Sequence, residues 1–215
     1  MLIGLRLVGR LACVMGLLGA ASACSVAGMA VGAGATAGVA ASQERGIESA
    51  IDDNKIGLEI NRLLIAEDPE LFTAVSTEIV EGRVLLTGQV ATQDARLTAA
   101  RLAWRAPGVR EIINEIQVAE SDGIAGYSKD VWISTKLRAR LLADTEIAAL
   151  NYTVETVRGT VYLMGIAQND AELRRAINHA RDISGVRNVV SYVQLKNDPS
   201  RPTLPGQATR GAPPE

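Results

Sequence analysis

An aromatic side chain and two cations recur at helical spacing in the second half of the chain. Trp132, Lys136 and Arg140 are each four residues apart, so on a helix they form a single stripe. Indole partitions to the headgroup boundary of a bilayer, and a cation near an anionic leaflet contributes about 1 kcal/mol. The stripe therefore predicts contact with an anionic membrane surface. The alternative is that Trp132 packs in a groove between domains and that the cations form a solvated face.

Residue types suited to catalysis or metal binding are sparse. The single histidine, His179, falls within a predicted helix and has no cysteine to share a metal with. Carboxylate pairs such as Asp144 and Glu146 fall where a predicted helix ends, as solvated loop residues do. Several glycines could suggest a phosphate loop, but they lack the following Lys-Ser/Thr and fall at predicted hairpins. We predict a non-enzymatic protein without a metal or cofactor and without a nucleic-acid partner.

Cys24 is the other residue with distinctive chemistry. Two arginines precede an apolar run from Leu11 to Ala21, which is too short to span a bilayer, and residues 21–23 are typical of a secretory cleavage site. The segment resembles the bacterial lipobox, although Ala21 stands where Leu is usual. Cleavage leaves no second cysteine for a disulfide, so we expect acylation of Cys24 and anchoring by its acyl chains. Ordinary cleavage after Ala23, giving a soluble protein with a free thiol, is the alternative.

The stripe lies in the second copy of a unit that repeats after 77 residues. Residues 53–118 align with residues 130–195 without gaps, which indicates one small fold made twice, because a stacked solenoid needs three or more units. The first copy carries seven Lys/Arg and ten Asp/Glu, whereas the second carries eight and seven. The first-copy equivalents of the stripe are Lys55, Glu59 and Leu63, and Glu59 would repel an anionic surface. The second copy is therefore the candidate for lipid contact.

Each copy opens with a helical pattern followed by two alternating ones. Apolar residues recur at helical spacing after Asp53 and Asp130, which we expect to begin the first helices. Alternating segments then flank Glu81-Gly82 and Arg158-Gly159, which predicts tight hairpins with Gly supplying a positive φ. These hairpins are expected over residues 75–88 and 152–165.

A second helix and a final strand complete each copy. The helices are predicted over residues 94–105, with Leu97, Ala100 and Trp104 on the apolar face, and over 170–183; the last strands are predicted over residues 109–118 and 186–195. A right-handed crossover then gives an α+β sandwich with a mixed three-stranded sheet and both helices on one face. Because units of about 66 residues bury little surface, we expect the copies to pack on each other or to exchange terminal segments.

Composition divides the chain into five segments. A Gly/Ala-rich stretch follows Cys24, and prolines gather at the C-terminal end. The predicted segments are a signal peptide over 1–23, the lipidated cysteine and linker over 24–50, two domains over 51–120 and 121–196, and a disordered Pro-rich tail over 197–215.

The hairpins and the Gly-Val pairs downstream of them resemble the BON domain of bacterial envelope proteins. The positions that carry this resemblance are Gly82-x-Val84-x-Leu86-x-Gly88 with Gly108-Val109, repeated as Gly159 to Gly165 with Gly185-Val186. Two such domains behind a lipobox resemble the dual-BON outer-membrane lipoproteins, the family of the division- and outer-membrane-stress-associated lipid-binding protein. The resemblance implies that the second domain binds anionic phospholipid at the periplasmic face of the outer membrane. It also implies a role in envelope integrity and cell division, and it brings no catalytic residues.

The local match is strongest from Asp130 to Lys136. We therefore predict Trp132, Thr135, Lys136 and Arg140 as phospholipid-binding residues, with the acyl anchor at Cys24. A serine rather than an aspartate after this cysteine resembles lipoproteins sent on to the outer membrane. The alternatives are an adaptor that recruits an envelope protein partner, and a soluble stress protein of the periplasm that lacks the acyl anchor.

Overall fold

The computed structural model describes residues 46–120 and 123–202. The expected signal peptide, the acylation site at Cys24 and most of the predicted linker lie outside the described residues. The first described residues are already helical, because helix α3 runs over Gly46–Glu67. Residues 46–50, the end of the predicted linker, therefore form the first turn of α3, in which Ala50 is buried.

The first domain follows the predicted order and adds one short helix. Its elements are α3, α4 (Pro69–Ala74), β1 (Val75–Val80), β2 (Arg83–Val90), α5 (Gln93–Ala103), β3 (Glu111–Asn114) and β4 (Gln117–Val118). Strand β1 runs antiparallel to β2, and β3 and β4 both run parallel to β2. The single final strand predicted over 109–118 is thus interrupted. The side chain of Asn114 causes the break, because its Oδ1 accepts from the Ile116 N–H at 3.2 Å.

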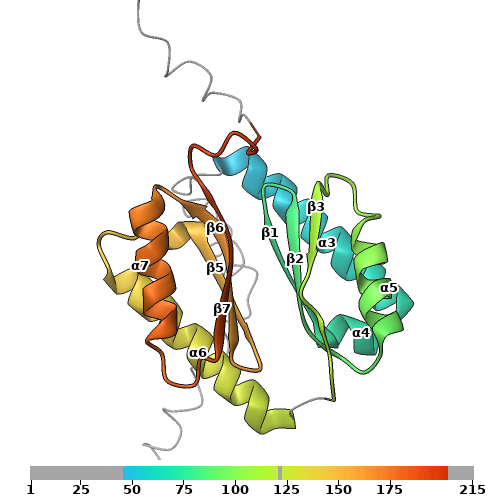
Figure 1. Ribbon diagram of the computed structural model, residues 1–215. Coiled ribbons are helices and arrows are strands. Elements are labelled where there is room, and N and C mark those ends of the chain that lie inside the picture. The colour runs from blue at the N-terminus through green and yellow to red at the C-terminus, as the bar shows by residue number, and fades with distance from the viewer. Residues whose placement is uncertain (1–45, 121–122, 203–215) are drawn as a thin grey trace, which may run out of the picture. The chain divides into compact units, whose positions relative to one another are not determined.

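The second domain repeats this plan with an uninterrupted last strand. Its elements are α6 (Gly123–Ala143), the 3-10 turn η1 (Ala149–Asn151), β5 (Tyr152–Val157), β6 (Thr160–Ala167), α7 (Asp170–Arg181) and β7 (Asn188–Leu195). Strand β6 lies between an antiparallel β5 and a parallel β7. Figure 1 shows helices α3, α4 and α5 on one side of the first sheet, and α6 and α7 on one side of the second. The predicted fold, with mixed sheets and helices on one face, is confirmed.

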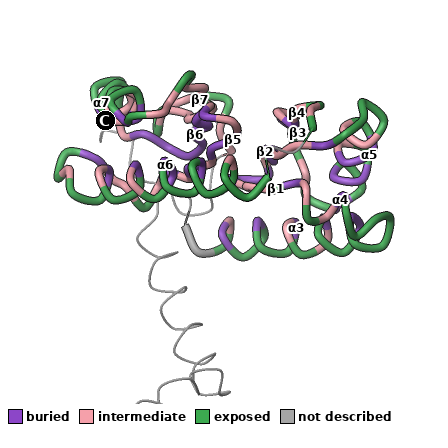
Figure 2. The backbone as a smooth tube through the Cα atoms, turned by 90° about the horizontal axis from the view of Figure 1, so that it is seen from below, coloured by how far each residue is buried: buried purple, intermediate pink, exposed green. Residues whose placement is uncertain are grey.

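Each helix layer and its sheet enclose an aliphatic core. In the first domain Ile60 and Leu64 of α3 pack against Leu86 of β2 and Leu102 of α5. The second domain uses Ile133, Leu137 and Leu141 of α6 with Val154, Val161 and Leu163 of its sheet and Ala176 and Ala180 of α7. Figure 2 shows the resulting alternation of buried and exposed residues along α3 and α6. The exposed half of each long helix is left available for other contacts.

A third core joins the opposite faces of the two sheets. Leu85 of β2 lies in one apolar cluster with Tyr162, Met164 and Ile166 of β6. The central strands are therefore buried on both faces, which explains the nearly continuous apolar sequence of β6 and the Val84–Leu86 run of β2. The expectation that the copies pack on each other is confirmed by this cluster.

Two polar contacts also join the domains. The Tyr192 hydroxyl donates to Glu115, and burial is the main cause that raises the pKa of Tyr192, followed by its bond to Glu115. Glu155 forms a side-chain hydrogen bond with Glu78, and burial is again the main cause that raises its pKa. These contacts lie beside the shared apolar cluster and fix which residues of the two sheets meet.

The predicted role of Asp53 and Asp130 as helix starts is wrong. Both lie inside their helices, which begin seven residues earlier at Gly46 and Gly123. Their buried carboxylates instead reach the hairpin turns. Asp53 accepts from the N–H groups of residues 81 and 82 at 3.0 and 2.8 Å, and Asp130 accepts from those of 158 and 159 at 2.7 and 2.9 Å.

These carboxylates stabilise an unusual turn. Glu81 and Gly82 have φ of 54° and 74°, and Arg158 and Gly159 have φ of 52° and 75°. A positive φ at both central residues is typical of a type I′ turn, as the hairpin spacing predicts. The side chain of a mid-helix aspartate thus holds the turn that connects the two antiparallel strands.

The predicted apolar face of α5 is wrong at Leu97 and Trp104, whereas Ala100 packs against the core as predicted. Leu97 and Trp104 are exposed, at 55% and 54% of their surface, and Ala99, Leu102 and Ala103 face the core instead. Ala99 and Ala103 have no exposed surface, so small side chains let α5 approach its neighbours closely. The larger residues are left on the outer side, and Trp104 becomes a surface residue of the first domain.

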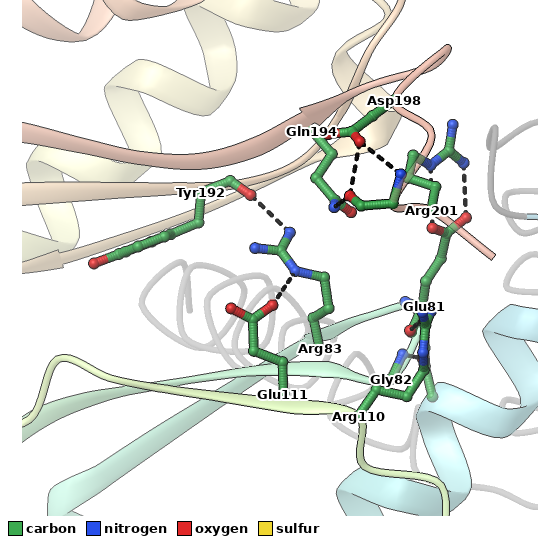
Figure 3. A network of polar contacts seen from close by, with 11 residues as sticks. Glu81, Gly82, Arg83, Arg110, Glu111, Tyr192, Gln194, Asp198 and Arg201 are labelled. Atoms are coloured by element: carbon green, nitrogen blue, oxygen red, sulfur yellow. Dashed lines mark hydrogen bonds and ion pairs between the residues drawn. The ribbon is translucent and has the colours of Figure 1, made fainter.

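The segment after β7 returns to the first domain (Figure 3). Arg201 Nη2 and Nε lie 2.7 and 3.1 Å from the two carboxylate oxygens of Glu81, and these side chains are 5% and 0% exposed. Arg83, bound to Glu111 at 2.6 Å, donates to the Tyr192 carbonyl oxygen at 3.0 Å. Residues 197–202, the first part of the predicted tail, thus include the counterion of a buried carboxylate. Residues 203–215 lie outside the described residues.

Candidate functional site

The outward face of α6 carries a line of three apolar side chains and one threonine, which we call the apolar line. Ile124, Val131, Thr135 and Leu142 are separated by seven, four and seven residues, and such spacings return to the same side of a 3.6-residue helix. All four are exposed, Ile124 to 87% and Leu142 to 66%. A soluble domain gains nothing from exposing this line to water. Its length along one helix suits contact with an extended apolar surface.

Trp132 borders this line together with basic side chains. It is 48% exposed, and the Lys136 Nζ lies 4.6 Å from the centre of its ring. This cation–π contact holds the ammonium beside the indole. Arg140 lies one turn further on, half-buried, and donates to the His179 carbonyl oxygen at 3.4 Å. Trp132 therefore does not fill a groove between domains, and the aromatic and basic stripe lies at the surface.

Helix α3 of the first domain is the counterpart of α6, and the outer faces of the two helices differ in their charges. It also exposes apolar residues seven apart, namely Ile51, Leu58 and Ile65. Its cations, however, are bound to carboxylates: Lys55 Nζ lies 2.9 Å from Asp52, and Arg62 forms two bonds to Glu59. The bond to Arg62 is the main cause that lowers the pKa of Glu59. The outer face of α3 thus combines its apolar line with paired charges, unlike that of α6.

The structure brings all four predicted residues onto one helix and adds residues that the sequence did not single out. Thr135 lies in the apolar line, and Trp132, Lys136 and Arg140 lie along its edge. Ile124 and Tyr127 were not predicted, because the helix was expected to begin at Asp130 and Gly123 and Gly126 argue against helix in the preceding turn. The helical spacing from Ile124 to Tyr127, three residues, and from Tyr127 to Val131, four residues, is the signal that could have found them.

The remaining polar residues form structural contacts. His179 Nε2 lies 2.7 Å from Asp144 Oδ2, and this bond is the main cause that lowers the pKa of Asp144. Within residues 46–120 and 123–202, no group of three or more His, Cys, Asp and Glu side chains is placed to hold a metal ion. Among these same residues, no helix is both long and apolar enough to cross a membrane.

A cavity of about 630 Å³ lies beside the inner edge of α6. Its lining includes Tyr127, Ser134 and Arg138 from α6, Glu155 from β5 and Gln89 from β2. Ser134 donates to Thr156 at 2.8 Å, and Arg138 donates to the Val154 carbonyl oxygen. These hydrogen bonds tie α6 to its own sheet, and Val131 is the one member of the apolar line that also lines the cavity.

Comparison with known proteins agrees with the duplicated fold. A family model described as the BON domain matches residues 52–120 and again residues 129–197. The chain is 41% identical over 152 residues to an uncharacterized protein in the gshII 5′ region of Anaplasma centrale, covering 70% of this chain and 99% of that one. It is 32% identical over 163 residues to the outer membrane lipoprotein DolP of Haemophilus influenzae, covering 74% and 83%. It is 28% identical over 148 residues to the osmotically-inducible protein Y of Escherichia coli, covering 68% and 74%.

Proposed function

The chain belongs to the BON-domain family, and from that premise we propose that it is an outer-membrane lipoprotein whose second domain binds anionic phospholipid. The observation that carries the proposal is the outer face of α6, where an exposed apolar line runs beside Trp132 and its stacked Lys136. An amphipathic helix with an apolar centre and a basic edge lies in the plane of a membrane surface. The relative named as an outer membrane lipoprotein supports the same location.

The pairing of charges supports the second domain over the first. Cations contribute to binding at an anionic leaflet when their charge is not already offset, and each contributes about 1 kcal/mol there. On α3 the cations Lys55 and Arg62 each have a carboxylate within 2.9 Å. On α6 Lys136 lies over an aromatic ring, which leaves its charge in place. The role we propose is non-enzymatic, in envelope integrity and cell division.

A membrane anchor at Cys24 makes weak headgroup binding sufficient. A tether converts the second contact into an intramolecular one with a high effective concentration. We expect the intact mass of the membrane-extracted protein to exceed that of the chain beginning at Cys24 by a diacylglyceryl group and an amide-linked acyl chain. Cys24→Ser should release the protein into the soluble fraction with both domains folded. An unmodified Cys24 at the N-terminus of the membrane-extracted protein would exclude the anchor.

Trp132→Glu should weaken binding to anionic vesicles on the order of thirtyfold, because it removes an interfacial indole and adds a repelled charge. The measurement is flotation of the Cys24→Ser chain with vesicles of phosphatidylglycerol and phosphatidylcholine in equal parts, compared with phosphatidylcholine alone. Lys136→Glu should weaken binding less at high salt than at low salt, because salt screens the charge contribution.

Trp104→Glu is the matched control. Trp104 is as exposed as Trp132, at 54% against 48%, but it follows α5 of the first domain. This variant should bind vesicles as the parent does, and circular dichroism should show all variants folded. Equal binding by a folded Trp132→Glu protein would exclude α6 as the lipid site and favour the adaptor function. Loss of binding only in Trp104→Glu would assign the contact to the first domain.

A further inference from the structure

A basic cavity lies at the hairpin turn of the second domain, apart from the outer apolar line of α6. It measures about 220 Å³ and is lined by Gly126, Lys129, Asp130, Arg158, Gly159 and Arg187. Three cations thus converge with one carboxylate. That carboxylate, Asp130, already accepts the N–H groups of residues 158 and 159. We propose that this cavity, which we call the basic cup, binds a phosphate group.

Glycines on two loops let the cationic side chains lie along the backbone. A Cβ atom on Gly185 would lie 3.0 Å from the Cε of Lys129, and one on Gly159 would lie 3.2 Å from the Cγ of Arg187. The Arg187 N–H also donates to the Gly159 carbonyl oxygen at 2.7 Å, which fixes the start of the Arg187 side chain. The stem of Arg187 is therefore held against the turn and that of Lys129 against the loop before β7, and both residues line the cavity.

The first domain contains the same cavity with the opposite charge. Its lining includes Asp52, Asp53, Glu81 and Arg110, which are the counterparts of Lys129, Asp130, Arg158 and Arg187. With Glu48, which also lines this cavity, four carboxylates converge with one guanidinium. One of these carboxylates, Glu81, binds a cation from the chain itself, since Arg201 forms two bonds to it.

The inverted charges indicate the ligand of the basic cup. Glu81 binds a guanidinium through two hydrogen bonds, and its counterpart Arg158 lines the basic cup with Lys129 and Arg187, which together supply donors for an oxyanion. Phosphate suits several convergent Lys and Arg side chains because it combines several acceptor oxygens with a high negative charge, and it is present both free and in phospholipid headgroups. The cup does not depend on the lipid-binding role of Trp132, so the two proposals can fail separately.

Nuclear magnetic resonance of the full-length Cys24→Ser chain tests the proposal with inorganic phosphate as the probe. Phosphate should shift the backbone amide signals of Gly126 and Gly159, and sodium chloride at the same ionic strength should not. Lys129→Met and Arg187→Met keep the aliphatic stems, and each should raise the apparent Kd for phosphate about fivefold or more. Lys129→Arg should retain binding. Lys55→Met, on the first helix of the other domain, should leave the Kd unchanged.

Vesicles distinguish the two sources of phosphate. If the cup binds a headgroup, Lys129→Met will also weaken flotation with phosphatidylglycerol vesicles; if it binds free phosphate, only the titration will change. Either result supports the cup. The proposal is overturned if phosphate shifts neither glycine signal beyond the chloride control. Trp132→Glu should leave the Kd for phosphate unchanged, whatever its effect on vesicle binding. The phosphate titration therefore tests the cup even if α6 does not bind lipid.

Discussion

Replacing Gly165 with alanine should unfold the second domain. This glycine lies on β6 with φ of 142°, and a Cβ atom there would lie 1.9 Å from the carbonyl oxygen of Asn151. No real side chain tolerates that distance, and the neighbouring atom is backbone that cannot rotate away. The strand pairing with β5 must therefore break or shift, at a cost of about 4 kcal/mol or more, which belongs to the severe end of single substitutions. Thermal unfolding followed by circular dichroism measures the loss.

Two further glycine substitutions test the steric argument, one expected to be as severe and one expected to be mild. Gly88 is the counterpart of Gly165 in the first domain, and its Cβ would lie 2.0 Å from the Ala74 carbonyl oxygen, so Gly88→Ala should be comparably severe there. Gly57 lies within α3, and its Cβ would meet only the flexible end of Ile79, at 3.3 Å. Gly57→Ala should change the stability by no more than about 1 kcal/mol. Similar stabilities for Gly165→Ala and Gly57→Ala would contradict the steric argument.

Asp130→Ala should be the second most damaging of these substitutions. It removes the acceptor of two buried N–H groups at the turn, and a hydrogen bond to a charged group contributes about 1.5–3 kcal/mol. The expected loss is about 3 kcal/mol or more, because the positive φ of Arg158 and Gly159 also loses its support. Urea unfolding of the full-length Cys24→Ser chain measures it, and hydrogen exchange should locate the loss in the β5–β6 hairpin.

Asp170→Ala is the control for removing a carboxylate. Asp170 lies exposed in the first turn of α7, so its loss should cost no more than about 0.5 kcal/mol. The stability lost in Asp130→Asn should fall between the losses in Asp130→Ala and Asp170→Ala. The amide keeps one acceptor oxygen but turns its NH₂ group towards the second N–H. If Asp130→Ala were as mild as Asp170→Ala, the carboxylate would not be holding the turn.

The order of elements could be predicted because it depends on local patterns. Helical and alternating periodicities changed at the same places in both copies, and glycine marked both type I′ turns. The role of Asp53 and Asp130 could not be predicted in this way. An aspartate near an apolar helical stripe is most often a cap, and the turn that these residues hold lies 28 residues further along the chain.

The candidate site was predicted in part for a similar reason. The stripe of Trp132, Lys136 and Arg140 follows from spacing alone once a helix is assumed. Its apolar neighbours Ile124 and Tyr127 were missed with the first turns of α6. Trp104 was assigned to the core, because its spacing to Leu97 fits a buried face as well as an exposed one; the choice depends on how closely α5 approaches its neighbours. The contact between Glu81 and Arg201 spans 120 residues and has no local signal.

The bond between Tyr192 and Glu115 joins positions 77 residues apart, which is the length of the repeat, and Glu155 meets Glu78 at the same separation. Each position therefore contacts its own counterpart, as residues on the axis of a twofold-symmetric dimer do. In a dimer of identical copies, any such residue faces itself, so an acid must face an acid. Joining the copies in one chain removes that restriction. Positions 78 and 155 still hold two glutamates, whereas at 115 and 192 a phenol now donates to a carboxylate, a pairing that no symmetric homodimer could form on its axis.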